Sequence, residues 1–139
     1  MADHIRLMIA DDHPMFRKGL RAMLESLPHF EVVAEAESGT TVVSLALQHR
    51  PDVILMDVQM PGLDGIEASR QILHGAPQIG ILILTMHQND DLVFAAMRAG
   101  ARGYLLKGAE QAEIVRAIET VSDGGAIFSP SIASRMAEY

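Results

Sequence analysis

The stretch VILMDVQMPGLDG, residues 53–65, decides how this chain folds. Its first four residues are all apolar, which is typical of a strand that is covered on both faces of a sheet. The run stops at Asp57, and the chain then turns through Pro61 and Gly62. Because burial of an unpaired acid costs free energy, we expect Asp57 to have charged or polar neighbours at the end of this strand.

Short apolar runs alternate with helical patterns on both sides of this stretch. The predicted strands cover residues 5–10, 31–36, 52–56, 79–84 and 103–106. A helix signal follows each strand, given in chain order by Pro14, Ser38, the capping box of Asp64 with Glu67, Asn89 and the apolar positions of residues 114–121. Five such units in a row predict a doubly wound α/β fold, in which a five-stranded parallel sheet carries helices on both faces.

The composition excludes several classes of protein. A chain of 139 residues suits one domain, and its net charge of −7 argues against nucleic-acid binding by this chain alone. The lack of cysteine excludes disulfides and favours a reducing compartment. No apolar run approaches the roughly 20 residues of a membrane span, and the run 5–10 is too short for a signal peptide. We therefore expect a soluble, cytoplasmic protein without a membrane partner.

Chemically reactive side chains follow four of the five predicted strands. Asp11 and Asp12 come after the first strand, Asp57 after the third, Thr85 after the fourth and Lys107 after the fifth. Any one of them alone would pass as a helix cap, a turn residue or a solvated lysine. Because ligands of open parallel sheets bind beyond the carboxyl ends of the strands, we expect these five side chains to form one site.

These residue types suit phosphoryl transfer with a metal ion. Three carboxylates close together repel one another, so the cluster needs a cation, and oxygen ligands suit Mg²⁺. Mg²⁺ and the Lys107 ammonium could both neutralise an incoming phosphoryl group. Asp57, on the central strand, could act as the nucleophile and form an acyl phosphate. The six histidines show no metal-ligand spacing and are interpreted as mostly surface residues, with His87 near Thr85 as a partial exception.

Four motifs together resemble the receiver domain of two-component response regulators. They are IADDHPMFRKGL (9–20), VILMDVQMPGLDG (53–65), ILTMH (83–87) and GYLLKG (103–108). The subtype resembles regulators whose C-terminal half is a LuxR/FixJ-type (NarL-like) helix-turn-helix. The resemblance implies a (βα)5 flavodoxin-like receiver fold with strand order 2-1-3-4-5 over residues 1–125. Residues 126–139 would begin the linker to an absent DNA-binding domain.

The resemblance also implies a role for each site residue. Asp57 would be the phosphoacceptor, and it would hold Mg²⁺ together with Asp11, Asp12 and the backbone carbonyl of Gln59. Asp12 would be the more direct ligand, with Asp11 acting through water.

Four further positions would respond to the phosphoryl group. Thr85 would hydrogen-bond the group and reorient, Lys107 would pair with one of its oxygens, and Tyr104 would turn inward as an aromatic switch. Gln59 and His87 lie two residues beyond Asp57 and Thr85, where their side chains would tune the lifetime of the phosphorylated state.

The implied partner is a sensor histidine kinase that docks near the first helix and donates from a phosphohistidine. Phosphorylation would favour a homodimer formed through the first and fifth helices, and DNA would be contacted only through the missing domain. The chain would not be an enzyme beyond its own phosphotransfer and autodephosphorylation. Its function would be transcription regulation by a phosphorylation-controlled switch.

Several alternatives remain open at this stage. The chain could be a free-standing receiver, or a phosphate-independent receiver that acts as a protein interaction module. A phosphatase of the haloacid-dehalogenase type is disfavoured because such enzymes have an acid where this chain has Gln59. A flavodoxin-like cofactor binder is disfavoured because Asp11 and Asp12 would repel its phosphate. Many receivers carry a proline in a cis peptide bond where this chain has Gly108, so the Lys107–Gly108 bond could be cis or trans.

Overall fold

The structure is a computed structural model that describes residues 4–87, 89–128 and 134. The strands are β1 (Ile5–Ala10), β2 (Phe30–Ala36), β3 (Val53–Met56), β4 (Gly80–Thr85), β5 (Gly103–Leu106) and β6 (Ile127–Phe128). The helices are α1 (Pro14–Glu25), α2 (Gly39–His49), α3 (Gly65–Gly75), α4 (Asp90–Arg98) and α5 (Gln111–Ser122). Over these residues the strands form one parallel sheet in the order β2-β1-β3-β4-β5-β6.

The predicted five-stranded sheet is wrong by one strand. The five predicted strands are present in the predicted order 2-1-3-4-5, and their bounds agree to within one residue at each end. The sixth strand, β6, pairs with β5 through Gly103 with Ile127 and Tyr104 with Phe128. A two-residue strand has no alternation that a sequence pattern could reveal, which is why we did not predict it.

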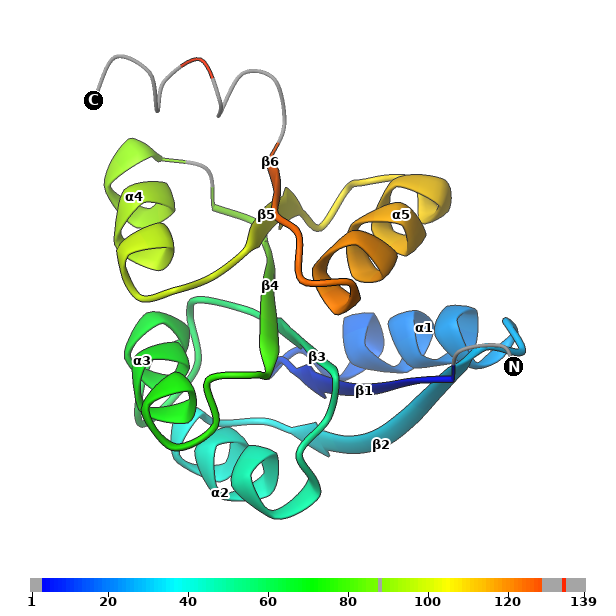
Figure 1. The fold of residues 1–139 in the computed structure, drawn as a ribbon, viewed down its shortest axis with the longest axis horizontal. Helices are drawn as coiled ribbons and strands as arrows, with labels where there is room; N and C mark the ends of the chain where they lie inside the picture. The colour runs from blue at the N-terminus through cyan, green and yellow to red at the C-terminus, as the bar shows by residue number, and fades with distance from the viewer. Residues whose placement is uncertain (1–3, 88, 129–133, 135–139) are drawn as a thin grey trace.

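The helices cover both faces of the sheet, as predicted (Figure 1). Helices α1 and α5 lie on one face, and α2, α3 and α4 lie on the other. Alternate residues of β3 serve the two faces: Val53 and Leu55 pack in the cluster with α1 and α5, whereas Ile54 and Met56 pack in the cluster with α2, α3 and α4. This double coverage explains why the strand is apolar throughout.

The helix starts follow the signals in the sequence. The side chains of Ser38, Asp64 and Asn89 each accept a hydrogen bond from a backbone N–H three residues on, at 3.2, 2.9 and 2.9 Å. Pro14 is the first residue of α1. These caps satisfy backbone donors that a helix leaves open, and they fix where each loop after a strand ends. None of the described helices combines the length and the hydrophobicity that crossing a bilayer requires.

Candidate functional site

The carboxyl ends of β1, β3, β4 and β5 meet at one edge of the sheet. In the strand register, Ala10 lies beside Met56, Met56 beside Ile83, and Thr85 beside Leu106. The residues that follow these strand ends therefore become neighbours, although they are separated widely in sequence. The structure brings together the five side chains that we expected to share a site: Asp11, Asp12, Asp57, Thr85 and Lys107.

Lys107 is the cation that compensates the buried acids. Its Nζ lies 2.8 Å from Asp11 Oδ2 and 2.9 Å from Asp57 Oδ2, and both aspartate side chains are 3% exposed. Burial alone lowers the pKa of Lys107, but the hydrogen bonds to Asp11 and Asp57 outweigh it, so the pKa is raised. The ammonium also lies 4.6 Å from the centre of the Phe16 ring, a favourable cation–π distance.

The two oxygens of Asp57 have different partners. Oδ1 accepts a hydrogen bond from the Thr85 hydroxyl at 2.7 Å and one from the backbone N–H of Gln59 at 3.3 Å. Oδ2 pairs with Lys107. Since Thr85 is fully buried, this arrangement holds the Asp57 carboxylate rigidly. The hydrogen bonds and the ion pair explain how an apolar strand can be followed by a buried acid.

A close backbone contact fixes the position of Asp57. Gly65, the first residue of α3, donates its N–H to Val58 O at 2.8 Å. A Cβ at this position would lie 2.1 Å from the carbonyl oxygen of Asp57, so only glycine fits here without a backbone shift. The turn after Asp57 is therefore tied directly to the start of α3.

The charges in the site leave a deficit of positive charge. Asp11, Asp12 and Asp57 supply three carboxylates, whereas Lys107 supplies one ammonium. Asp12 Oδ1 is buried and accepts no hydrogen bond from any part of the chain that the structure describes. Carboxylate oxygens in this number suit a hard divalent cation such as Mg²⁺, so the residues fit the metal that the sequence predicts.

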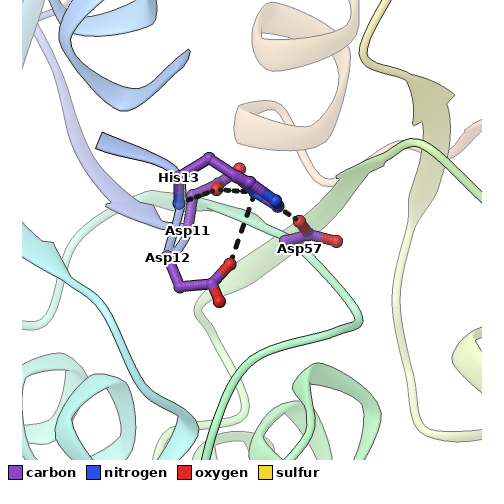
Figure 2. Close-up of side chains that lie close together, drawn as sticks. All are labelled: Asp11, Asp12, His13 and Asp57. Atoms are coloured by element: carbon purple, nitrogen blue, oxygen red, sulfur yellow. Dashed lines mark hydrogen bonds and ion pairs between the residues drawn. The ribbon is translucent and has the colours of Figure 1, made fainter. Parts of the chain in front are cut away.

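His13 joins this cluster, which we did not predict. Its Nδ1 lies 2.9 Å from Asp11 Oδ1, 3.3 Å from Asp12 Oδ1 and 3.8 Å from Asp57 Oδ2 (Figure 2). The interpretation of the histidines as mostly surface residues without a metal pattern therefore misses His13. A search for spacing between histidines could not find it, because its companions are carboxylates. The usable signal was the adjacency of Asp11, Asp12 and His13 at one strand end.

Arg17 is a second residue that the sequence did not single out. Its Nη1 donates to the backbone carbonyl of Asp11 at 2.6 Å, and its Nε donates to Glu35 at 2.8 Å. The side chain is 14% exposed. Arg17 thereby ties the loop after β1 to strand β2, and this contact helps to hold Asp11 in place.

Tyr104, on strand β5, is buried at 1% exposure. Its hydroxyl donates a 2.6 Å hydrogen bond to the backbone carbonyl of His87. Burial, together with the negative charge of Asp57, raises the pKa of Tyr104 to about 12. The backbone N–H of His87 in turn lies 3.5 Å from Thr85 Oγ1, so residue 87 connects the tyrosine and the threonine.

The remaining two predictions concern loops beside the cluster. No peptide bond in the described residues is cis, so the Lys107–Gly108 bond is trans. The Lys107 N–H donates to Thr85 O at 2.8 Å, which extends the pairing of β4 with β5 by one residue. Gln59 is exposed and lines an open hollow with Asp12 and His13. Its side chain therefore shares this hollow with the side chain of Asp12.

Comparisons with known proteins agree with this geometry. The model of the family described as "Response regulator receiver domain" matches residues 7–119. The chain is 45% identical over 133 residues to the transcriptional regulatory protein LiaR of Bacillus subtilis (strain 168), which covers 96% of the chain and 61% of LiaR. The chain spans between 56% and 62% of the length of the curated relatives that it matches.

Solved structures of response regulators also resemble this chain in fold. A two-component response regulator of the LuxR family from Aurantimonas sp. SI85-9A1 is 41% identical, with a TM-score of 0.90 over 98% of this chain and 97% of that one. The response regulator RcsB of Salmonella typhimurium, studied for its DNA interaction, is 27% identical, with a TM-score of 0.89 over 98% of this chain and 71% of that one. RcsB has also been solved as two dimers bound to two parallel DNAs.

Proposed function

The chain belongs to the response regulator receiver domain family, and on this premise we propose that Asp57 accepts a phosphoryl group from a sensor histidine kinase. The observation that carries the proposal is the division of partners at Asp57. One carboxylate oxygen is held by the Thr85 hydroxyl and the other pairs with the Lys107 ammonium. A hydroxyl donor and a cation are what a phosphoryl group requires around it.

The proposed step makes one bond and breaks one. A carboxylate oxygen of Asp57 attacks the phosphorus of a phosphohistidine, and the N–P bond breaks with its electron pair returning to the imidazole. The product is an acyl phosphate on Asp57. Lys107 moves with the negative charge from the carboxylate to the phosphoryl oxygens, and Thr85 donates its hydroxyl to the same group. Receiver domains are in general not enzymes in the usual sense, and we propose that this one catalyses only its own phosphotransfer and autodephosphorylation.

We infer that Mg²⁺ binds between the acids during this step. Asp12, with its buried oxygen that lacks a hydrogen bond in the described structure, would be a direct ligand. Asp57 and the backbone carbonyl of Gln59 would complete the protein ligands, and Asp11 would act through water. The ion would supply charge neutralisation for the phosphoryl oxygens. Two carboxylates plus water suit the preference of Mg²⁺ for few protein ligands.

We propose that the chemical event reaches the surface through Thr85 and Tyr104. The Thr85 hydroxyl already bonds Asp57, and the Tyr104 ring is already buried with its hydroxyl bonded to the His87 carbonyl. The phosphoryl group would hold both side chains in these inward positions. Because His87 begins the loop before α4, this would stabilise one arrangement of the surface formed by α4, β5 and α5.

The output that we propose is dimerisation and control of a DNA-binding domain. The predicted receiver, residues 1–125, would extend through strand β6, because Ile127 and Phe128 pair with β5. The predicted linker would then begin after residue 128, in a segment that lies outside the described residues except for residue 134. Helices α1 and α5 would form the dimer contact. LuxR-family relatives and the dimeric, DNA-bound RcsB support this scheme. Light scattering with and without beryllofluoride, a phosphoryl mimic, tests the dimer, and a mass that never changes would rule it out.

The direct test of the proposed function is the chemical identity of the modified residue. After incubation with acetyl phosphate and Mg²⁺, borohydride reduction converts an aspartyl phosphate to homoserine. Peptide mass spectrometry should then find the change at position 57. A change at another carboxylate would reassign the phosphoacceptor, whereas no change at any position would favour a phosphate-independent interaction module.

A further inference from the structure

His13 occupies the N-cap position of α1 but does not cap the helix. Its backbone is extended, with φ −98° and ψ 102°, and its side chain accepts no hydrogen bond from the first turn. Ser, Thr, Asp and Asn are the residues preferred at this position, because their side chains bond the open N–H groups. The backbone N–H of His13 donates instead to Asp11 Oδ1 at 2.8 Å, which turns the residue back toward the acids.

The imidazole nitrogen points into the carboxylate cluster. Figure 2 shows Nδ1 directed at the space between Asp11, Asp12 and Asp57, although the side chain as a whole is 59% exposed. One ligand atom from each of these four residues lies within 4.8 Å of all the others. A six-coordinate ion with ligands at about 2.1 Å holds neighbouring donors about 3.0 Å apart and opposite donors about 4.2 Å apart.

The measured separations fall in this range. From Nδ1 they are 2.9, 3.3 and 3.8 Å to the three carboxylate oxygens. Nδ1 also lies 3.0 Å from Lys107 Nζ, so the nitrogen already faces a cation. With the ring proton on Nε2, the Nδ1 lone pair is directed at the same space as the carboxylate oxygens.

We propose that His13 is a metal ligand of this site and that it gives the cluster a preference for borderline transition-metal ions over Mg²⁺. Magnesium favours oxygen donors and keeps its water, whereas imidazole suits Fe²⁺, Ni²⁺, Cu²⁺ and Zn²⁺. A fourth donor that is nitrogen therefore adds affinity for those ions and adds little for Mg²⁺. The inference rests on the proposed function, since it concerns the same cation site.

The test compares two ions on three variants of the tag-free protein. Calorimetric titrations with CoCl₂ and with MgCl₂ give both affinities for the wild type, His13→Ala and Asp12→Asn. Co²⁺ serves as the probe because it follows Mn²⁺ and Fe²⁺ in the affinity order for nitrogen and oxygen sites. We expect His13→Ala to lower Co²⁺ affinity at least about tenfold and Mg²⁺ affinity less than about threefold. Asp12→Asn should weaken both ions.

Matched variants separate this effect from unrelated ones. His74→Ala removes an exposed histidine at the end of α3 and should change neither affinity. His13→Gln keeps a polar side chain and should lose Co²⁺ affinity as His13→Ala does. The visible absorption of bound Co²⁺ reports nitrogen ligation directly, and it should change in both His13 variants but not in His74→Ala.

Two results would overturn the inference, and they are distinct from a failure of the proposed function. One is an unchanged ratio of Co²⁺ to Mg²⁺ affinity in His13→Ala. The other is an unchanged absorption spectrum of bound Co²⁺. In both cases Mg²⁺ binding that depends on Asp12 would leave the phosphorylation proposal intact. A wild type that binds no Mg²⁺ at all would count against both proposals.

Discussion

Lys107 Nζ lies 2.9 Å from Asp57 Oδ2, although the two residues directly follow different strands, β5 and β3, that are separated by β4. Both side chains are nearly buried, at 6% and 3% exposed. The negative charge of Asp57 after strand β3 is thus compensated by the Lys107 ammonium, which reaches across strand β4. The pair is a structural element of the fold and also the pair that phosphoryl transfer would reorganise.

Removing the Lys107 ammonium should lower the stability of the folded protein. In Lys107→Met, Asp11 and Asp57 stay buried without a counter-charge, and loss of one partner of a buried pair costs about 3–5 kcal/mol of unfolding free energy. Added Mg²⁺ should recover part of this loss, because the ion replaces the missing positive charge. Urea unfolding of both proteins in EDTA and in MgCl₂ measures the effect. An equal stability of the variant and the wild type in EDTA would contradict it.

Tyr104 should make the protein sensitive to alkali. Its pKa is raised from 10.0 to about 12 in the folded protein. Between these values the unfolded chain releases the phenolic proton and the folded chain keeps it, so the unfolding free energy falls as pH rises through this window. A single group contributes at most about 1.4 kcal/mol per pH unit to this slope.

The variant Tyr104→Phe isolates this contribution. It loses the hydrogen bond to His87, which lowers stability by about 1 kcal/mol below pH 10, where Tyr104 is protonated in both the folded and the unfolded chain. Its stability should nevertheless fall less steeply than that of the wild type from pH 10 to pH 12. Denaturant unfolding at pH 8, 10, 11 and 12 gives both curves, and parallel curves would show that Tyr104 keeps an ordinary pKa.

Two glycine substitutions should have opposite effects. Gly65→Ala would place a Cβ 2.1 Å from Asp57 O, so the backbone that carries Asp57 must shift, and we expect a loss of at least about 1–3 kcal/mol together with weaker Mg²⁺ binding. Gly19→Ala in α1 meets nothing within 4 Å and should gain about 0.5–1 kcal/mol. Thermal and urea unfolding compare them. A harmless Gly65→Ala would show that this contact does not position Asp57.

Gln59 and His87 should set the lifetime of the acyl phosphate. We propose that their side chains flank the route of the hydrolytic water, because each lies two residues beyond a group that holds the phosphoryl site. The hydrogen bonds that link Gln59 to Asp57 and His87 to Thr85 come from their backbone N–H groups. The double variant with Gln59→Ala and His87→Ala should therefore take up phosphoryl groups normally and lose them at a rate that differs several-fold from the wild type. Decay followed by ³¹P NMR measures this, with His74→Ala as the control. Superimposable decay curves would remove both residues from this role.

Much of the fold follows from local patterns in the sequence. The apolar run of residues 53–56 predicts a strand covered on both faces, and Ser38, Asp64 and Asn89 predict helix starts that the structure confirms. Strand β6 could not be predicted, because its two residues pair only through the tertiary register with β5. Its position depends on where α5 returns the chain, and no local pattern encodes that.

The site could be predicted as a set of residues but not as a set of contacts. Parallel strand ends meet at one edge, so the meeting of Asp57, Thr85 and Lys107 followed from the strand pattern. The direction of the His13 side chain could not be predicted from the strand pattern. It depends on a local turn in which the His13 backbone N–H donates to the Asp11 side chain. The contact of Arg17 with Asp11 likewise requires the neighbouring strand β2 to be in place.

The most direct test of the account is the intact mass of the protein after incubation with acetyl phosphate, with and without Mg²⁺, for the wild type and for Asp57→Asn. The account predicts that the wild type gains the mass of one phosphoryl group only when Mg²⁺ is present. It also predicts that Asp57→Asn gains none under any condition. An equal gain by the variant, or no gain by the wild type with Mg²⁺, would contradict the assignment of Asp57 as the phosphoacceptor.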